Sequence, residues 1–323
     1  MHAVRLHAFG PAENLRYEEV EDPVPGPGQV RVAVAAAGVH LLDTALREGE
    51  RGPLPELPAL PTVPGREVAG VVDALGEGTD PVWRGRRVVA HLGFAPGGYA
   101  ELAVTDADRL HEIPDRLDAA EAVAMIGTGR TALGIAQFAE PGPDTVAVIP
   151  AAAGGIGTLL TRYAKNAGAT VVGLAGGPAK TRLVTAYGAD LAVDYRTPTW
   201  PDEARAFLAG RPATVVYDGV GGEVAREAVA LLGPGGRHLV FGWSAEGIRG
   251  GTGHFVDGVS ESVLGPAMLH RAGGLRALEL RALTEAATGR LTPTVHRFPL
   301  HRAAAAHRAL ETRATTGKVV LEP

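Results

Sequence analysis

The middle of the chain alternates short apolar stretches with helical ones, and this rhythm restricts the folds available to it. The apolar stretches are residues 145–150, 170–174, 191–195, 214–219 and 237–242, with amphipathic stretches between them. Strands that alternate with helices in this way build a doubly wound parallel sheet covered on both faces. The sequence therefore predicts an α/β fold with a Rossmann domain over residues 119–254.

The two flanks of this region follow a different pattern. Residues 1–118 contain short strands broken by turns, among them the Pro/Gly-rich stretch EDPVPGPG. Such a pattern of short strands and turns is typical of a β-rich domain. Residues 255–323 begin with a helical pattern. They end with a predicted strand at 293–300, a helix at 301–314 and a strand at 318–322. We expect these closing strands to rejoin the first domain.

The sharpest local motif is AAAGGIG, residues 151–157, which lies directly after a predicted strand and opens a helix. Its glycines permit a tight turn and close backbone approach, and the first amides of the helix can bind a pyrophosphate. A strand-to-helix turn can need such glycines for geometry alone. The βαβ context favours dinucleotide binding by Ala153, Gly154, Gly155, Ile156 and Gly157.

The end of the second strand indicates which dinucleotide binds. An acidic side chain usually holds the ribose hydroxyls of NAD at this point. Here residues 173–177 are neutral, and Lys180 and Arg182 supply positive charge that suits a 2′-phosphate. The sequence therefore favours NADPH. The alternative is that both cations merely form the solvated face of a helix.

Charge and composition exclude several classes of protein. A net charge of −5 and a pI near 6.1 give no broad basic surface for nucleic acid. The opening MHAVRLHAFGPAEN lacks the apolar core of a signal peptide, and no apolar run is long enough for a membrane span. We expect a cytoplasmic protein with a small-molecule partner. The absence of cysteine excludes disulfides and any metal site built on sulfur ligands.

Motifs along the whole chain extend this interpretation. They are AGVHLLDTALREG, PGREVAGVV, GGYAELAV, GTGRTAL, AAAGGIG, VVYDGVGG and the ending HRALETRATTGKVVLEP. With these motifs the chain resembles the zinc-free quinone oxidoreductase (zeta-crystallin-like) branch of the medium-chain dehydrogenase/reductase superfamily. The resemblance implies a GroES-like catalytic domain from 1–118 and 255–323, an inserted NADPH-binding Rossmann domain over 119–254, and a homodimer.

The resemblance also allows the zinc positions of related enzymes to be checked. They fall on His40 in GVHLLD, Arg66 in PGRE and Thr128 in IGTGR. An arginine does not bind a metal cation, so we expect no catalytic metal. One alternative stays open, because His40, Asp43 and Glu67 are suitable residue types for metal ligands.

For the cofactor, the resemblance implies that Lys180, Tyr195 and Arg313 surround the 2′-phosphate. Gly176 departs from the serine or threonine of many relatives, which implies a looser cradle. Arg130 stands where relatives usually have an apolar residue. Its side chain either reaches the cofactor or substrate or points to solvent, and the sequence favours neither alternative. The remaining implied cofactor contacts are Thr131, Val220, Phe241 and Gly242.

Without zinc, the acceptor must itself be activated toward hydride, which favours quinones and α,β-unsaturated carbonyl compounds. His40 is the candidate donor or general acid, although a histidine of the cleft wall fits as well. Asp43 either orients His40 or caps a helix, and Thr128 either contacts the nicotinamide or only packs. Residues 46–57 lack the aromatic residues that line the quinone pocket of relatives. A pathway-specific enoyl reductase and a non-catalytic NADPH-binding protein therefore stay as alternatives.

Overall fold

The computed structural model describes residues 1–52, 56–242, 244–245 and 255–323, and the chain divides into two units. The β-rich unit comprises Met1–Thr128, Ala282–Ala287 and Pro293–Pro323. The Rossmann-type unit comprises Gly129–Arg281 and Thr288–Thr292. Among the described helices, none combines the length and apolarity that crossing a membrane requires.

The Rossmann-type unit contains the predicted parallel sheet. Its six strands are arranged in the order β10-β9-β8-β11-β12-β13, and every pair is parallel. The strands are β8 (Val146–Ile149), β9 (Thr170–Ala175), β10 (Leu191–Asp194), β11 (Ala213–Asp218), β12 (Leu232–Val240) and β13 (Ser260–Ser262). Five of them, β8 to β12, overlap predicted strands, and the central strands β8 and β9 are apolar runs that are buried almost throughout.

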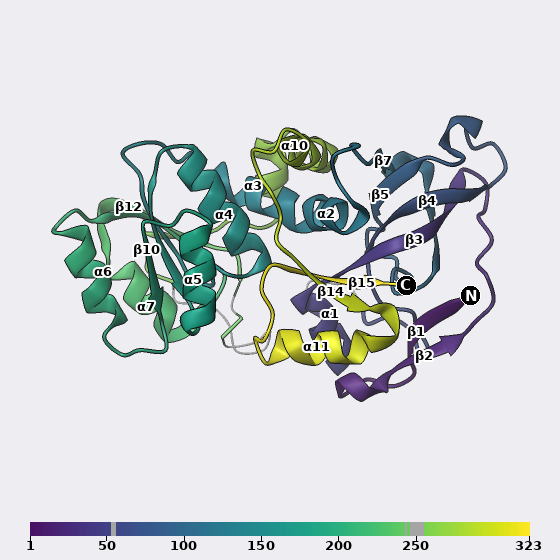
Figure 1. Ribbon diagram of the computed structural model, residues 1–323, viewed down its shortest axis with the longest axis horizontal. Coiled ribbons are helices and arrows are strands. Elements are labelled where there is room, and N and C mark those ends of the chain that lie inside the picture. Colours follow the sequence, from purple (N-terminus) through teal and green to yellow (C-terminus); the bar gives the residue numbers. More distant parts are fainter. Residues whose placement is uncertain (53–55, 243, 246–254) are drawn as a thin grey trace. The chain divides into compact units, whose positions relative to one another are not determined.

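Helices cover both faces of this sheet, as Figure 1 shows. On one face Trp200 and Leu208 of α6 (Trp200–Leu208) and Ala228 of α7 (Gly222–Val229) pack in the core with alternate strand residues. On the other face Val184 of α5 (Pro178–Ala186) lies against Gly173. The helix α4 (Gly155–Asn166) contacts β8 and β9. This double cover explains why the strands are apolar throughout.

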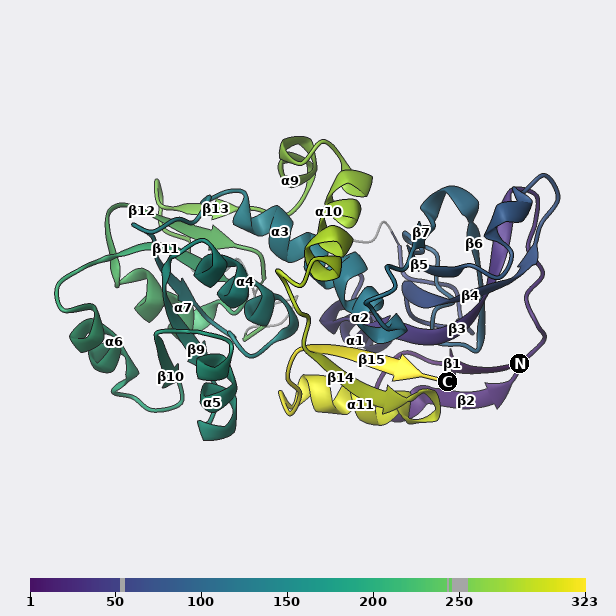
Figure 2. The same cartoon turned by 45° about the horizontal axis from the view of Figure 1, so that its top comes forward.

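The β-rich unit is organised around β3 (Gln29–Val39), which pairs with β4 (Glu67–Leu75), β6 (Leu102–Asp106) and β15 (Lys318–Glu322). Its seven-stranded sheet has the order β14-β15-β3-β4-β5-β7 with β6 beside β3. The other strands are β5 (Arg87–His91), β7 (His111–Glu112) and β14 (Val295–Pro299), and β1 (His2–Leu6) forms a separate pair with β2 (Leu15–Glu19). Figure 2 shows β14 and β15 side by side. The expected return of the closing strands to the first domain is confirmed.

The observed units and the predicted domain boundaries differ at two places. Residues 119–128 belong to the β-rich unit, and residues 255–281 belong to the Rossmann-type unit. The second shift has a clear cause, because β13 extends the parallel sheet beside β12. Residue 254, the predicted boundary, lies outside the described residues. The remaining helices after it are α9 (Pro266–Arg271), α10 (Leu275–Ala287) and α11 (Ala303–Glu311).

The helical stretch over residues 119–136 contains a widened turn. It comprises α2 (Ala119–Val123), a π-helical segment over Ala124–Gly129, and α3 (Arg130–Ala136). A Cβ atom on Gly127 would lie far inside the 3.0 Å that real Cβ atoms keep from a neighbour, because it would overlap the Glu67 carboxylate. π-Helical turns of this kind are frequent at functional sites.

Candidate active site

The Glu67 carboxylate is the centre of a buried cluster of charged side chains in the β-rich unit. Glu67 is the first residue of β4 and is fully buried. Its two oxygens lie so close to Gly38 and Gly127 that a Cβ on either glycine would overlap them. The backbone of β3 and of the π-helical segment therefore encloses the carboxylate without intervening side chains.

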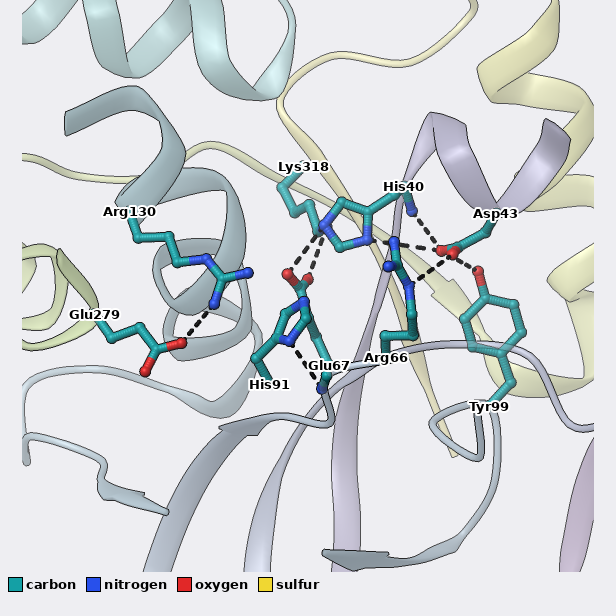
Figure 3. Close-up of polar contacts among 10 residues, drawn as sticks. His40, Asp43, Arg66, Glu67, His91, Tyr99, Arg130, Glu279 and Lys318 are labelled. Atoms are coloured by element: carbon teal, nitrogen blue, oxygen red, sulfur yellow. Dashed lines mark hydrogen bonds and ion pairs between the residues drawn. The ribbon is translucent and has the colours of Figure 1, made fainter. Parts of the chain in front are cut away.

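Two cations compensate this buried charge, as Figure 3 shows. His40 Nε2 lies 2.9 Å from Glu67 Oε1, and Lys318 Nζ lies 2.9 Å from Oε2. Burial by itself raises the pKa of the Glu67 carboxyl, but the charges of His40 and Lys318 outweigh it and hold the pKa well below its ordinary value. Glu67 is therefore an anion in the folded protein.

His40 lies between two carboxylates. It precedes α1 (Leu41–Glu48), and its backbone N–H donates to Asp43 Oδ2 at 2.8 Å. Its ring Nδ1 lies 3.7 Å from the same oxygen, and its Nε2 faces Glu67. Asp43 thus caps the helix through the His40 backbone N–H, whereas its contact with the ring is longer than a hydrogen bond; the orienting role of Asp43 stays a prediction.

Asp43 is itself buried and held by further polar groups. The Tyr99 hydroxyl donates to Asp43 Oδ2 at 3.1 Å and also lies 3.1 Å from His307 Nε2. Burial alone raises the pKa of Asp43, but the hydrogen bond and charge of His40, together with Arg66, lower it below its ordinary range. Burial lowers the pKa of His307 to about 4. Asp43 is therefore ionised, and His307, to which Tyr99 connects it, is neutral.

The geometry also bears on a metal site. Among the residues that the structure describes, no group of three or more His, Cys, Asp and Glu side chains is arranged to hold a metal ion. His40, Asp43 and Glu67 thus do not form such a group, and Lys318 lies 2.9 Å from Glu67 Oε2. Thr128, the third zinc-related position, is buried near the end of the π-helical segment.

The glycine motif forms the turn between β8 and α4 in the Rossmann-type unit. Ala151 has a φ of 52°, and the Gly154 N–H donates to the Ala151 carbonyl at 2.8 Å. A Cβ on Gly157 would overlap that carbonyl, so a side chain does not fit there. The first turn of α4 contains Gly155 and Ile156. Its N–H groups have no partner within the helix, which is the property that favours an anion at such a terminus.

The end of β9 is formed differently from the prediction. A Cβ on Gly176 would lie 2.8 Å from the Tyr195 hydroxyl, and one on Gly177 would overlap the Arg196 guanidinium. Gly176 therefore leaves the space that the Tyr195 hydroxyl occupies, and the absence of a side chain there does not by itself make the predicted phosphate site looser. Lys180, in α5, is half-buried.

Arg196 is a cation that the sequence analysis missed. Its Nη2 lies 3.0 Å from Asp194 Oδ2, and the hydrogen bonds from Arg196 lower the pKa of Asp194 to about 2. Its position directly after Tyr195 was a usable signal. Arg182 is exposed on α5.

The other predicted cofactor residues occupy the expected elements. Thr131 is half-buried in α3, and the Val220 N–H donates to Asp218 Oδ1 at 2.7 Å in the turn after β11. Phe241 and Gly242 follow β12, where the Phe241 ring lies against Gly219. Arg313 follows the C-cap of α11 with a φ of 57° in the β-rich unit.

Arg130 forms an ion pair with Glu279 of α10, and both side chains are largely buried. This contact is at odds with a side chain that simply points to solvent. Contact of Arg130 with the ligand stays a prediction.

Comparisons with known proteins agree with this arrangement. Residues 26–115 match the alcohol dehydrogenase GroES-like domain, and residues 155–270 match the zinc-binding dehydrogenase family. The chain is 32% identical to a 2-haloacrylate reductase of a Burkholderia species, covering 99% of this chain and 98% of the relative. It is also 32% identical to a quinone oxidoreductase of Pseudomonas aeruginosa, over 99% of both chains.

A solved structure shows the same likeness in three dimensions. The Escherichia coli quinone oxidoreductase complexed with NADPH superimposes with a TM-score of 0.86, at 27% identity and over 100% of both chains. The likeness thus includes both units. The chain belongs to the zinc-free quinone oxidoreductase branch of the medium-chain dehydrogenase/reductase superfamily.

Proposed function

We propose that this protein is an NADPH-dependent oxidoreductase that transfers hydride to a quinone or an α,β-unsaturated carbonyl compound without zinc. The observation that carries the proposal is the end-to-end likeness to quinone oxidoreductases, one of them solved with NADPH. The likeness to a 2-haloacrylate reductase supports an activated alkene as an acceptor. Both substrate types accept hydride at a conjugated carbon.

The described residues fit NADPH. The turn at Gly154–Gly157 gives close backbone approach for a pyrophosphate, and residues 173–177 at the end of β9 carry no acidic side chain that would repel a 2′-phosphate. Lys180, Tyr195 and Arg196 would hold that phosphate, and Arg313 is a further predicted partner. When bound, NADPH supplies the hydride. Ala153, Thr131, Val220, Phe241 and Gly242 are the remaining proposed contacts.

His40 is the proposed proton donor. Its Nε2 lies 2.9 Å from Glu67 Oε1, and its Nδ1 lies 3.7 Å from Asp43 Oδ2. An imidazole N–H in this place can donate to the negative oxygen that hydride addition creates and can supply a proton. Asp43 and Glu67 fix the ring, and Thr128 is the proposed neighbour of the nicotinamide.

The test is the loss of NADPH absorbance with phenanthrenequinone, benzoquinone and a simple enone, with NADH in parallel and a chelator as a control. We expect faster turnover with NADPH that the chelator leaves unchanged. NADPH binding without turnover on any acceptor, crotonyl thioesters included, would favour a non-catalytic role instead. Turnover only with the thioester would favour an enoyl reductase.

Two further properties belong to this proposal. We expect a homodimer, as in the family that the sequence resembles, and a cytoplasmic location. Light scattering behind size exclusion tests the first, since a mass near the 33.3 kDa of one chain would contradict it. Cell fractionation tests the second.

A further inference from the structure

A pocket in the β-rich unit contains two arginines for which a neutral quinone offers no negatively charged partner. It has a volume of about 370 Å³, which lies within the range of small-molecule sites. It is bordered by α1, by the loop that leads into β4, and by the loop after β5. Most of the lining is apolar, contributed by Leu6, Leu46, Leu57, Pro58, Phe94 and Pro96.

Two arginines interrupt this apolar lining. Arg66 has only 13% of its side chain exposed, and its Nε, 3.8 Å from Asp43 Oδ1, makes no hydrogen bond among the described residues. Arg47 is 1% exposed. Its Nη2 pairs with Glu48 and Glu311, whereas its Nε and Nη1 are buried and lack a hydrogen-bond acceptor within the described part of the chain.

Such donors require an acceptor. A buried N–H without a partner is costly, and a guanidinium matches the two oxygens of a carboxylate in a planar fork. The acidic residues that line the pocket do not supply all the hydrogen-bond acceptors that these arginine N–H groups require. Asp43 already accepts from the His40 N–H and the Tyr99 hydroxyl, and Glu56 is exposed.

We propose that the natural acceptor carries a carboxylate, which this pocket binds through Arg66 and Arg47. The inference rests on the proposed function and narrows its substrate class to conjugated carbonyl compounds with an acid group. Asp43 links the two parts of the site, because it lines the pocket with Arg66 and also holds His40. The acid end would lie on the arginines and the conjugated carbonyl toward the imidazole.

β-Acetylacrylate is a suitable probe of this class, since it combines an enone with a carboxylate. A hydride adds to the carbon β to the ketone, and the electron pair of the C=C bond moves onto the ketone oxygen. A proton then bonds to the α carbon, and the C=O bond is restored. The alkene is reduced to laevulinate while NADPH is oxidised to NADP⁺, so atoms and electrons balance.

The experiment compares kcat/KM for β-acetylacrylate with that for its methyl ester, which removes only the charge. We expect the native protein to prefer the acid, and Arg66→Gln to reduce the acid-to-ester ratio by roughly tenfold to a hundredfold. Arg84→Gln, which alters an exposed arginine of the same unit, should keep the native ratio. Equal rates for acid and ester in the native protein would overturn the inference, and so would an equal loss of both in Arg66→Gln.

A binding measurement separates this inference from the proposed function. Ligand-observed NMR on the protein with NADP⁺ compares laevulinate with methyl laevulinate, and circular dichroism checks that each variant is folded. Binding of the acid alone, weakened in Arg66→Gln, supports the inference even if no acceptor is turned over. Turnover of quinones without any preference for acids would retain the proposed function and refute the carboxylate.

Discussion

Replacing Lys318 by methionine tests how the buried Glu67 carboxylate is stabilised. Lys318 is 4% exposed, Glu67 is fully buried, and their charged atoms are 2.9 Å apart. The substitution keeps most of the apolar volume but leaves the anion with His40 alone. Breaking one side of a buried ion pair costs about 3 to 5 kcal/mol, a large part of the 5 to 15 kcal/mol typical of a folded domain, roughly speaking.

The assay is urea unfolding followed by far-UV circular dichroism across a range of pH. The pKa of Glu67 is held well below its ordinary value of 4.5, so its ion pairs stabilise the native protein above that pH and are lost as the pH falls. Without Lys318 the pKa of Glu67 should rise, because one of the charges that oppose the effect of burial is then missing. The deficit of the variant should therefore be largest at neutral pH and shrink in acid.

A matched control comes from the surface. Lys165 and Asp190 are 2.8 Å apart but partly exposed, so Lys165→Met should cost about 1 kcal/mol or less. The double variant with Glu67→Gln and Lys318→Met should recover part of the loss, since it removes both charges. A loss no greater than that of the control, or one that does not vary with pH, would refute this account of the cluster.

Three further predictions follow from the same contacts. Gly127→Ala should lower stability by about 1 to 3 kcal/mol in thermal unfolding, because the new methyl group overlaps the buried carboxylate; Gly142→Ala, with open space around it, should change little. Gly176→Ser restores the residue of many relatives. It should nevertheless weaken NADPH binding severalfold in a fluorescence titration, because the new Cβ would lie 2.8 Å from the Tyr195 hydroxyl. Tighter NADPH binding would contradict this prediction. The pKa of His307 is lowered to about 4, so the native protein should lose up to about 3 kcal/mol as the pH falls from about 6.5 toward that value; His307→Gln should flatten the pH profile of the unfolding midpoint.

Local signals were sufficient to predict the architecture. The apolar strands of the Rossmann-type unit, the turn at Gly154–Gly157 and the helix that begins at Leu41 are each specified by neighbouring residues. These patterns depend on periodicity and on glycine chemistry, which a single sequence displays directly. The expectation that no catalytic metal binds also rests on a local signal, because an arginine such as Arg66 does not bind a metal cation.

The partners of the site residues were not predictable in the same way. Lys318 appeared only as the first residue of a closing strand, yet it neutralises Glu67 from the opposite end of the chain. Arg130 pairs with Glu279 of α10, and Gly176 is required by Tyr195. Each of these pairs is created by the tertiary fold, and residues far apart in sequence give no periodic signal of their contact.

The position of Lys318 in the last strand also has a consequence for biosynthesis. β3 and β4 leave the ribosome early, whereas β15 follows only after the entire Rossmann-type unit has been made. Until then the nascent β-rich unit lacks both the strand that pairs with the C-terminal half of β3 and the ammonium group that compensates Glu67. Completion of the β-rich unit therefore waits for synthesis of the Rossmann-type unit, and a stop codon between residues 293 and 318 would leave every residue of that unit in place but remove β15 and the counter-charge of Glu67.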